Sequence, residues 1–142
     1  MEKHILALDL GKGSLGMAVS RSGLFATPLE NLRFKAGEYE EAFAHLKKVV
    51  EREDVQHFVL GLPLYPSGDE CEMTPICKKF GAKLQELYPD IPLSFQDERN
   101  STVEASEMMH LSGENAKKQK KHIDSGAAMI ILERYLKSIG QM

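Results

Sequence analysis

The sequence contains only two cysteines, Cys71 and Cys77, and no long run of apolar residues. Two thiols are too few for a disulfide-rich scaffold, and their spacing matches no zinc-binding pattern. The apolar run at residues 4–8 is far too short to cross a membrane, and no secretory signal is visible. These absences predict a reduced, cytoplasmic protein that does not associate with membranes.

A strong excess of charge of one sign is also missing. The 18 Lys and Arg residues nearly balance the 21 Asp and Glu residues, which gives a formal net charge of -3. This balance excludes a wholly basic nucleic-acid coat protein but is compatible with a local basic patch. No repeat, low-complexity tract or linker interrupts the 142 residues. We therefore expect residues 1–142 to form one domain around one substantial core.

Short apolar runs and amphipathic stretches predict both strands and helices. The expected strands are residues 4–8, 15–20, 29–34, 58–61 and 91–95. The expected helices are residues 38–51, 70–87, 102–111 and 123–137, with a polar loop at 112–121. Strands that come first in hairpins and later alternate with helices indicate an α/β architecture, in which helices cover a mixed sheet.

Acidic residues stand where two of the expected strands end. Asp9 precedes a glycine-rich turn at residues 11–16, which suits either a tight turn or a close approach to phosphate. Alternatively, Asp9 simply caps this turn. Asp97 and Glu98 follow the fifth strand, and strand neighbours point to opposite faces, so one of them can face a cleft. The alternative is that both are solvated and Arg99 pairs with one of them.

A further acid, Asp124, stands at the start of the last expected helix. Helical spacing places it on one face with apolar residues, namely Ala128, Ile131, Leu132 and Tyr135. A carboxylate on a stripe that faces the sheet is rarely left unpaired, because burying a lone charge is costly. The alternative is an ordinary acid of the first helical turn, which the helix dipole stabilises.

Taken together, these acids indicate a metal site. Carboxylates gathered at one edge of a sheet repel one another unless a cation lies between them, and hard oxygen ligands suit Mg²⁺ or Mn²⁺. Two such ions about 4 Å apart can activate a water and stabilise the leaving oxygen in phosphodiester hydrolysis.

Four blocks of the sequence carry a resemblance to a known family. They read ALDLGKGSLGMAVS (7–20), VLGLPLYPSGDE (59–70), DERNSTVEA (97–105) and IDSGAAMIILERYL (123–136). With these blocks in order over nearly its whole length, the chain resembles the YqgF/RuvX-like family of pre-16S rRNA nucleases. This family is also called Holliday-junction-resolvase-like and belongs to the ribonuclease H superfamily. The resemblance implies a ribonuclease H-like fold, with a mixed five-stranded sheet and helices on both faces.

The resemblance also implies an activity and its residues. Asp9, Glu98 and Asp124 match the family's catalytic acids and would hold Mg²⁺ or Mn²⁺, with Asp97 as the less favoured ligand. The implied reaction is metal-dependent hydrolysis that matures the 5′ end of pre-16S rRNA, in which water attacks and the 3′ oxygen leaves. One alternative is a nuclease for Holliday junctions or other structured DNA. Another is a non-catalytic RNA-binding factor in ribosome assembly.

The expected partner is nucleic acid, with pre-rRNA favoured over DNA. Ribosomal precursor particles are further expected partners, and the chain is expected to act as a monomer or weak dimer. The expected contacts are Lys12, Arg99, Ser101, Thr102, Lys117, Lys118, Lys120 and Lys121. The four lysines of this set would meet a phosphate backbone well through counterion release, although lysine runs are more often solvated loops. Where relatives carry basic residues after the first Asp-x-Gly, this chain has Gly13 and Ser14, so Lys12 is the nearest substitute.

A rival reading starts from the same first block. An actin-like or sugar-kinase ATP-binding module also begins with a strand, Asp-x-Gly, a glycine turn and a second strand. That fold needs a second lobe to close over the nucleotide, and 142 residues leave no room for it.

Overall fold

The computed structural model describes the backbone of residues 1–98 and 116–142, and the side chains of 1–98 and 126–142. Its elements are β1 (Ile5–Leu10), β2 (Ser14–Ser20), β3 (Thr27–Arg33), α1 (Tyr39–Glu53), β4 (His57–Leu62), α2 (Met73–Leu87), β5 (Leu93–Asp97) and α4 (Ala116–Ser138). None of the helices in this described part has the length and apolar character that crossing a bilayer requires.

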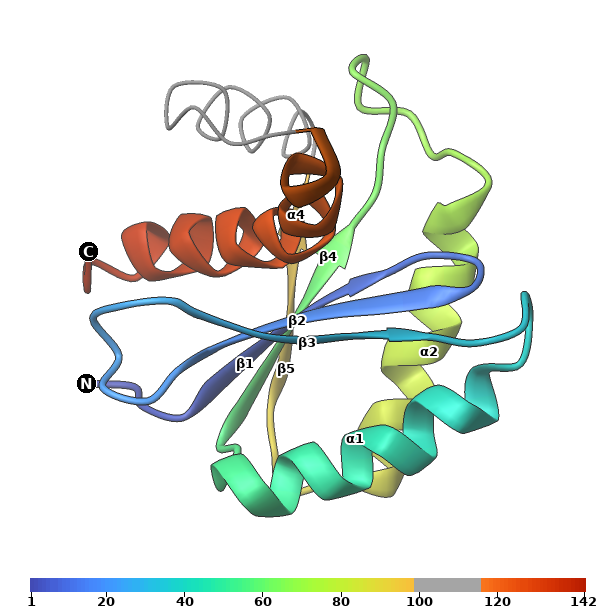
Figure 1. Cartoon of the computed structure of the whole chain (residues 1–142). Coiled ribbons are helices and arrows are strands. Elements are labelled where there is room, and N and C mark those ends of the chain that lie inside the picture. The colour runs from blue at the N-terminus through green and yellow to red at the C-terminus, as the bar shows by residue number, and fades with distance from the viewer. Residues whose placement is uncertain (99–115) are drawn as a thin grey trace.

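The five strands form one mixed sheet in the order β3-β2-β1-β4-β5. The first three strands pair antiparallel as consecutive hairpins, whereas β4 joins β1 in parallel and β5 joins β4 in parallel. Helices α1 and α2 cover one face of the sheet, and α4 covers the other (Figure 1). The expected mixed sheet with helices on both faces is therefore confirmed.

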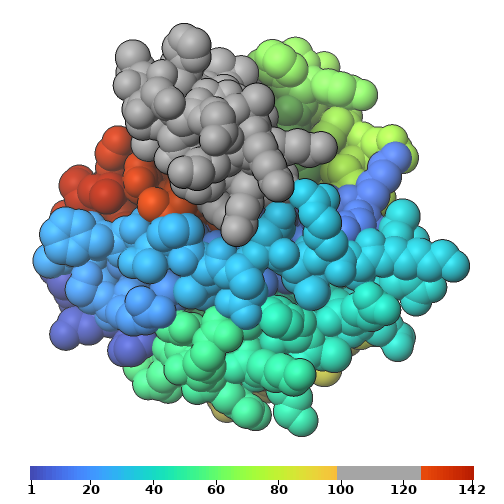
Figure 2. Space-filling view, in the orientation of Figure 1, coloured from blue at the N-terminus to red at the C-terminus, as the bar shows by residue number. Residues whose placement is uncertain are grey.

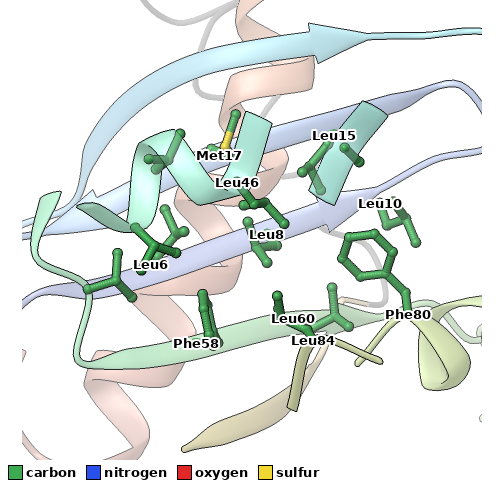
Figure 3. Packing of buried hydrophobic residues seen from close by; sticks show 14 of the residues in the cluster. Leu6, Leu8, Leu10, Leu15, Met17, Leu46, Phe58, Leu60, Phe80 and Leu84 are labelled. Atoms are coloured by element: carbon green, nitrogen blue, oxygen red, sulfur yellow. The ribbon is translucent and has the colours of Figure 1, made fainter. Parts of the chain in front are cut away.

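Alternation along β1 divides the core between the two faces. Leu6, Leu8 and Leu10 belong to the cluster that packs under α1 and α2 (Figure 3). Ile5 and Ala7 belong to the second cluster, which is formed with α4. Because strand side chains alternate between faces, Asp9 continues the second series and lies on the α4 face. The core pattern thus fixes the direction in which the first acid points.

The start of the last helix differs from the sequence-based expectation. Residues 116–121 were expected to be loop, but α4 already begins at Ala116. Alanine, lysine and glutamine are strong helix formers, and no proline or glycine interrupts this stretch, which explains the extension. Asp124 consequently lies beyond the first helical turn, where the helix dipole has little effect. The interpretation of Asp124 as a helix-initiating acid is therefore wrong.

Helix α2 begins later than expected, at Met73 rather than at residue 70. The preceding loop closes on itself through a bridge between Leu64 and Glu70. Buried Thr74 then accepts a hydrogen bond from the backbone N–H of Cys71 at 2.9 Å. These local bonds satisfy backbone groups that an earlier helix start would have used.

The far end of α4 is fastened to the sheet by polar contacts. The Tyr135 hydroxyl donates to the Glu2 carboxylate, at 3.0 and 2.8 Å from its two oxygens. Glu2 also lies 2.8 Å from Nδ1 of His57, and Nε2 of His57 lies 2.9 Å from the Ser94 hydroxyl. This network joins the N-terminal segment, β4, β5 and α4 at the end of the sheet where β1 starts.

Replacing Tyr135 by phenylalanine should weaken this attachment. The hydroxyl bonds a partly buried carboxylate, so its loss should lower the free energy of unfolding by about 1–3 kcal/mol. Chemical denaturation measures the change. Tyr65→Phe is the matched control, because Tyr65 is 54% exposed. Equal stability of the two variants would contradict the expected role of Tyr135.

Candidate metal centre

Asp9 and Glu98, which are far apart in the sequence, meet at one edge of the sheet. Strands β1, β4 and β5 run parallel, so their carboxyl ends lie at the same edge. The backbone N–H of Glu98 donates to the Leu62 carbonyl at 3.3 Å, which extends the strand pairing just past β5. The Glu98 side chain then forms a hydrogen bond with Asp9. The structure therefore brings Asp9 and Glu98 into direct contact.

Gly61 on the central strand β4 makes room for this contact. The pairing of Leu8 with Leu60 places Asp9 beside Gly61. A Cβ at Gly61 would lie 2.7 Å from Oε2 of Glu98 and 2.5 Å from Cδ1 of Ile131. Both distances are well below van der Waals contact, so a side chain here would push against the acid and against α4. Gly61 thus leaves room for the two carboxylates to approach each other across β4 without displacing Glu98 or Ile131.

The acid pair holds a proton. Burial, followed by the negative charge of Asp9 and the hydrogen bond with it, raises the pKa of Glu98 to about 9. At neutral pH the two carboxyl groups therefore share one proton, as closely spaced carboxylates do when both cannot ionise. A divalent cation could replace that proton, and metal binding to such a site releases protons. The oxygen donor set and its mutual repulsion fit Mg²⁺ or Mn²⁺.

Both cysteines lie close to this acid pair, which the sequence pattern did not indicate. Cys77 is fully buried, and burial together with the charges of Glu98 and Asp9 raises its pKa to about 12. Cys71 is partly exposed, and its hydrogen bond with Thr74 lowers its pKa. Cys77 therefore stays a neutral thiol within the core cluster under α1 and α2 and adds no charge near the acids.

The structure describes the other two candidate acids, Asp97 and Asp124, to different extents. Asp97 is the last residue of β5, where alternation places it on the face opposite Glu98; its carbonyl accepts a bond from Arg134 at 3.1 Å. The side chain of Asp124 lies outside the described residues. The apolar positions of its stripe are buried against the sheet as expected, namely Ala128, Ile131, Leu132 and Tyr135. Among the side chains described, no three His, Cys, Asp or Glu residues form a metal-binding group.

The expected nucleic-acid contacts are only partly described. Lys12 lies in the β1–β2 turn, with its Nζ 2.8 Å from Oε1 of Glu72. Arg99, Ser101 and Thr102 lie outside the described residues. The lysines at 117, 118, 120 and 121 belong to α4 rather than to a loop, and their side chains also lie outside the described set.

Comparison with known proteins gives a consistent result. A family model described as RuvX, Holliday junction resolvase, matches residues 3–138. A relative from Streptococcus equi subsp. equi (strain 4047), named "Putative pre-16S rRNA nuclease", is 37% identical over 135 residues, covering 94% of this chain and 96% of the relative. A relative of the same name from Latilactobacillus sakei subsp. sakei (strain 23K) is 34% identical over 141 residues, covering 98% and 96%.

Solved structures share the architecture at low sequence identity. T. thermophilus RuvC in complex with a Holliday junction substrate superposes with a TM-score of 0.62 at 14% identity, covering 98% of this chain and 97% of that one. The yeast mitochondrial Holliday junction resolvase Ydc2 gives a TM-score of 0.57 at 13% identity, covering 98% and 80%. At these identities the likeness shows the fold alone, and it confirms the expected ribonuclease H-like fold.

The raised pKa of Glu98 predicts a pH-dependent stability without metal. The folded protein holds this proton up to about pH 9, whereas an unfolded glutamate releases it near the ordinary value of 4.5. The stabilising contribution is therefore complete below pH 4.5 and is lost as the pH rises towards 9. Melting temperatures in EDTA should fall over this range, and Glu98→Gln, which mimics the protonated acid, should fall less. Glu86→Gln, on the exposed face of α2, is the control and should show the same fall in melting temperature as the wild type. If Glu98→Gln also shows the wild-type fall, the acid pair does not share a proton.

Gly61→Ala should disturb the site and the packing of α4 together. Forcing a methyl group against Glu98 and Ile131 should lower the free energy of unfolding by about 1–3 kcal/mol. Adding Ile131→Val removes the Cδ1 atom that the methyl group would meet, so the double variant should recover part of this loss. Denaturant titrations of both variants and of Ile131→Val alone measure the coupling. Strict additivity would show that the predicted clash does not occur.

Proposed function

The chain belongs to the RuvX family, described as Holliday junction resolvase, and on that premise we propose that it is a metal-dependent nuclease that hydrolyses phosphodiester bonds. The observation that carries this proposal is the contact between Asp9 and Glu98 at the carboxyl edge of the sheet. We extend the proposal to the whole chain, so that residues 1–142 act as one ribonuclease H-like nuclease domain in the cytoplasm.

Asp9 and Glu98 would hold Mg²⁺ or Mn²⁺, with Asp124 of α4 as the third acid. When bound, the metal supplies activation of the attacking water and stabilisation of the leaving 3′ oxygen. The role of the surrounding residues is to position the two carboxylates. Gly61 keeps the two carboxylates close together, and the buried α4 face behind them limits access of bulk water. Glu98 would have to release its proton to serve as a metal ligand, because ligand carboxylates bind metals in their ionised form.

We favour the 5′ end of pre-16S rRNA as the substrate, because the relatives that match most of the chain at 34–37% identity carry that name. The helical state of residues 116–121 supports a nucleic-acid contact by the lysines there. In a helix, positions 117, 121 and 124 fall on one face, so two of these lysine positions share the side of α4 that carries Asp124. Arg99, Ser101 and Thr102, which follow Glu98 directly, complete the proposed contacts, together with Lys12. Ribosomal precursor particles are the proposed setting.

Cleavage of defined substrates by the purified chain tests the activity. With Mn²⁺ present, a precursor 16S 5′ leader RNA should be cut, and a four-way DNA junction in parallel tests the alternative that the family description raises. Asp9→Asn, Glu98→Gln and Asp124→Asn should each slow cleavage by on the order of 100-fold or more, because each removes a carboxylate that would hold the metal ion.

Circular dichroism of the three variants serves as the control for folding. Unchanged turnover in all three would show that the acids are misassigned. If RNA is bound but not cleaved at any level of Mg²⁺ or Mn²⁺, the chain is instead a non-catalytic assembly factor.

A further inference from the structure

An exposed ion pair joins the turn that follows Asp9 to the start of α2. Lys12 in the β1–β2 turn and Glu72, just before α2, place Nζ and Oε1 2.8 Å apart. The two side chains are 58% and 73% exposed, so the pair lies at the surface. The blue β1–β2 turn and the yellow-green start of α2 are side by side in the space-filling view (Figure 2). A lysine expected to bind phosphate is thus already engaged by a carboxylate of the same chain.

Both residues of this ion pair are close in the sequence to residues at or near the acid site. Lys12 follows Asp9 by three positions in the sequence. Glu72 directly follows Cys71, which lies close enough to Glu98 to contribute to the raised pKa of that acid. The pair therefore links two segments that border the acid site, one from the end of β1 and one from the start of α2.

The backbones on both sides of the pair are held in place. The Lys12 carbonyl accepts a hydrogen bond from Gly37 at 3.0 Å. On the other side, the hydroxyl of buried Thr74 donates to the Pro63 carbonyl, and Tyr65 donates through its N–H to the Asp69 carbonyl at 2.9 Å. Because these bonds do not involve the two charged side chains, the pair can open by side-chain rotation alone.

We propose that Glu72 is an intramolecular competitor of substrate phosphate for Lys12 and so lowers the affinity of the site for nucleic acid. This inference rests on the proposed function. A phosphate group and a carboxylate present similar oxygen acceptors to an ammonium group, so one replaces the other at Lys12. Binding of a nucleic-acid strand across this edge of the sheet then releases Glu72 into solvent.

The effect of this competition is modest and depends on salt. Exposed ion pairs of this kind are worth little, and their measured strengths correspond to about 1.4- to 5-fold in an equilibrium constant. Glu72 therefore lowers affinity without blocking the site. Because ions screen an exposed pair, the effect should shrink as the salt concentration rises.

The same loop offers a matched control in Glu70. Its Oε2 lies 2.9 Å from Nζ of Lys78, and the two side chains are 56% and 50% exposed. Glu70→Gln and Glu72→Gln change the net charge equally and lie two positions apart. The two variants differ in which lysine they free, since Lys78 belongs to α2 and Lys12 to the turn after β1.

Fluorescence anisotropy with labelled 5′ leader RNA in EDTA, where no cleavage occurs, tests the proposal. At low salt, Glu72→Gln should bind about two- to fivefold more tightly than Glu70→Gln. The difference should disappear when both are combined with Lys12→Gln, and it should decline with added salt. Equal affinities of the two single variants, or an advantage that persists without Lys12, would overturn the proposal.

This experiment separates the inference from the function on which it rests. If the wild type binds neither RNA nor the four-way DNA junction in EDTA and cleaves neither of them in Mn²⁺, the nuclease proposal fails and the competition fails with it. If binding is normal but Glu72→Gln matches Glu70→Gln, only the competition is wrong.

Discussion

Repulsion between two carboxyl groups held in contact is the constraint on which the site depends. Asp9 and Glu98 share one corner of the sheet, where burial removes the water that would otherwise screen their charges. The folded chain tolerates the pair by retaining a proton there. Such an arrangement destabilises the fold when no cation is bound. It is useful in a protein that binds a cation, because the bound metal relieves the repulsion.

The two apolar layers supply the stability against which this repulsion is set. The cluster under α1 and α2 and the cluster under α4 together bury most of the side chains of β1 and β4. Parallel pairing of β1, β4 and β5 places their carboxyl ends at one edge, which is where open α/β sheets bind ligands. Gly61 completes the arrangement, since the central strand must present no side chain between the acids.

Much of this could be predicted from the sequence, because it rests on local patterns. Apolar runs located all five strands. The acids at strand ends pointed to Asp9 and to the pair Asp97 and Glu98, and the family resemblance favoured Glu98 within that pair. The start of α4 was missed because a lysine-rich stretch has no apolar periodicity, although it favours helix. The roles of Gly61 and Glu72 could not be predicted, since each depends on a neighbour from a distant segment. The nearness of Cys77 to the acids is likewise a property of packing alone.

The attachment of the C-terminal end of α4 affects the position of its N-terminal half. Tyr135, Glu2 and His57 fix the last turns of the helix at the end of the sheet opposite the acids. Ile131 precedes Tyr135 by about one helical turn, and its side chain already lies against Gly61, next to the acid pair. A rigid helix transmits this placement along its length, because its backbone hydrogen bonds resist bending. The anchoring of the distant end thereby helps to position the segment that carries Asp124, which gives a polar network far from the acid pair a part in the proposed metal site.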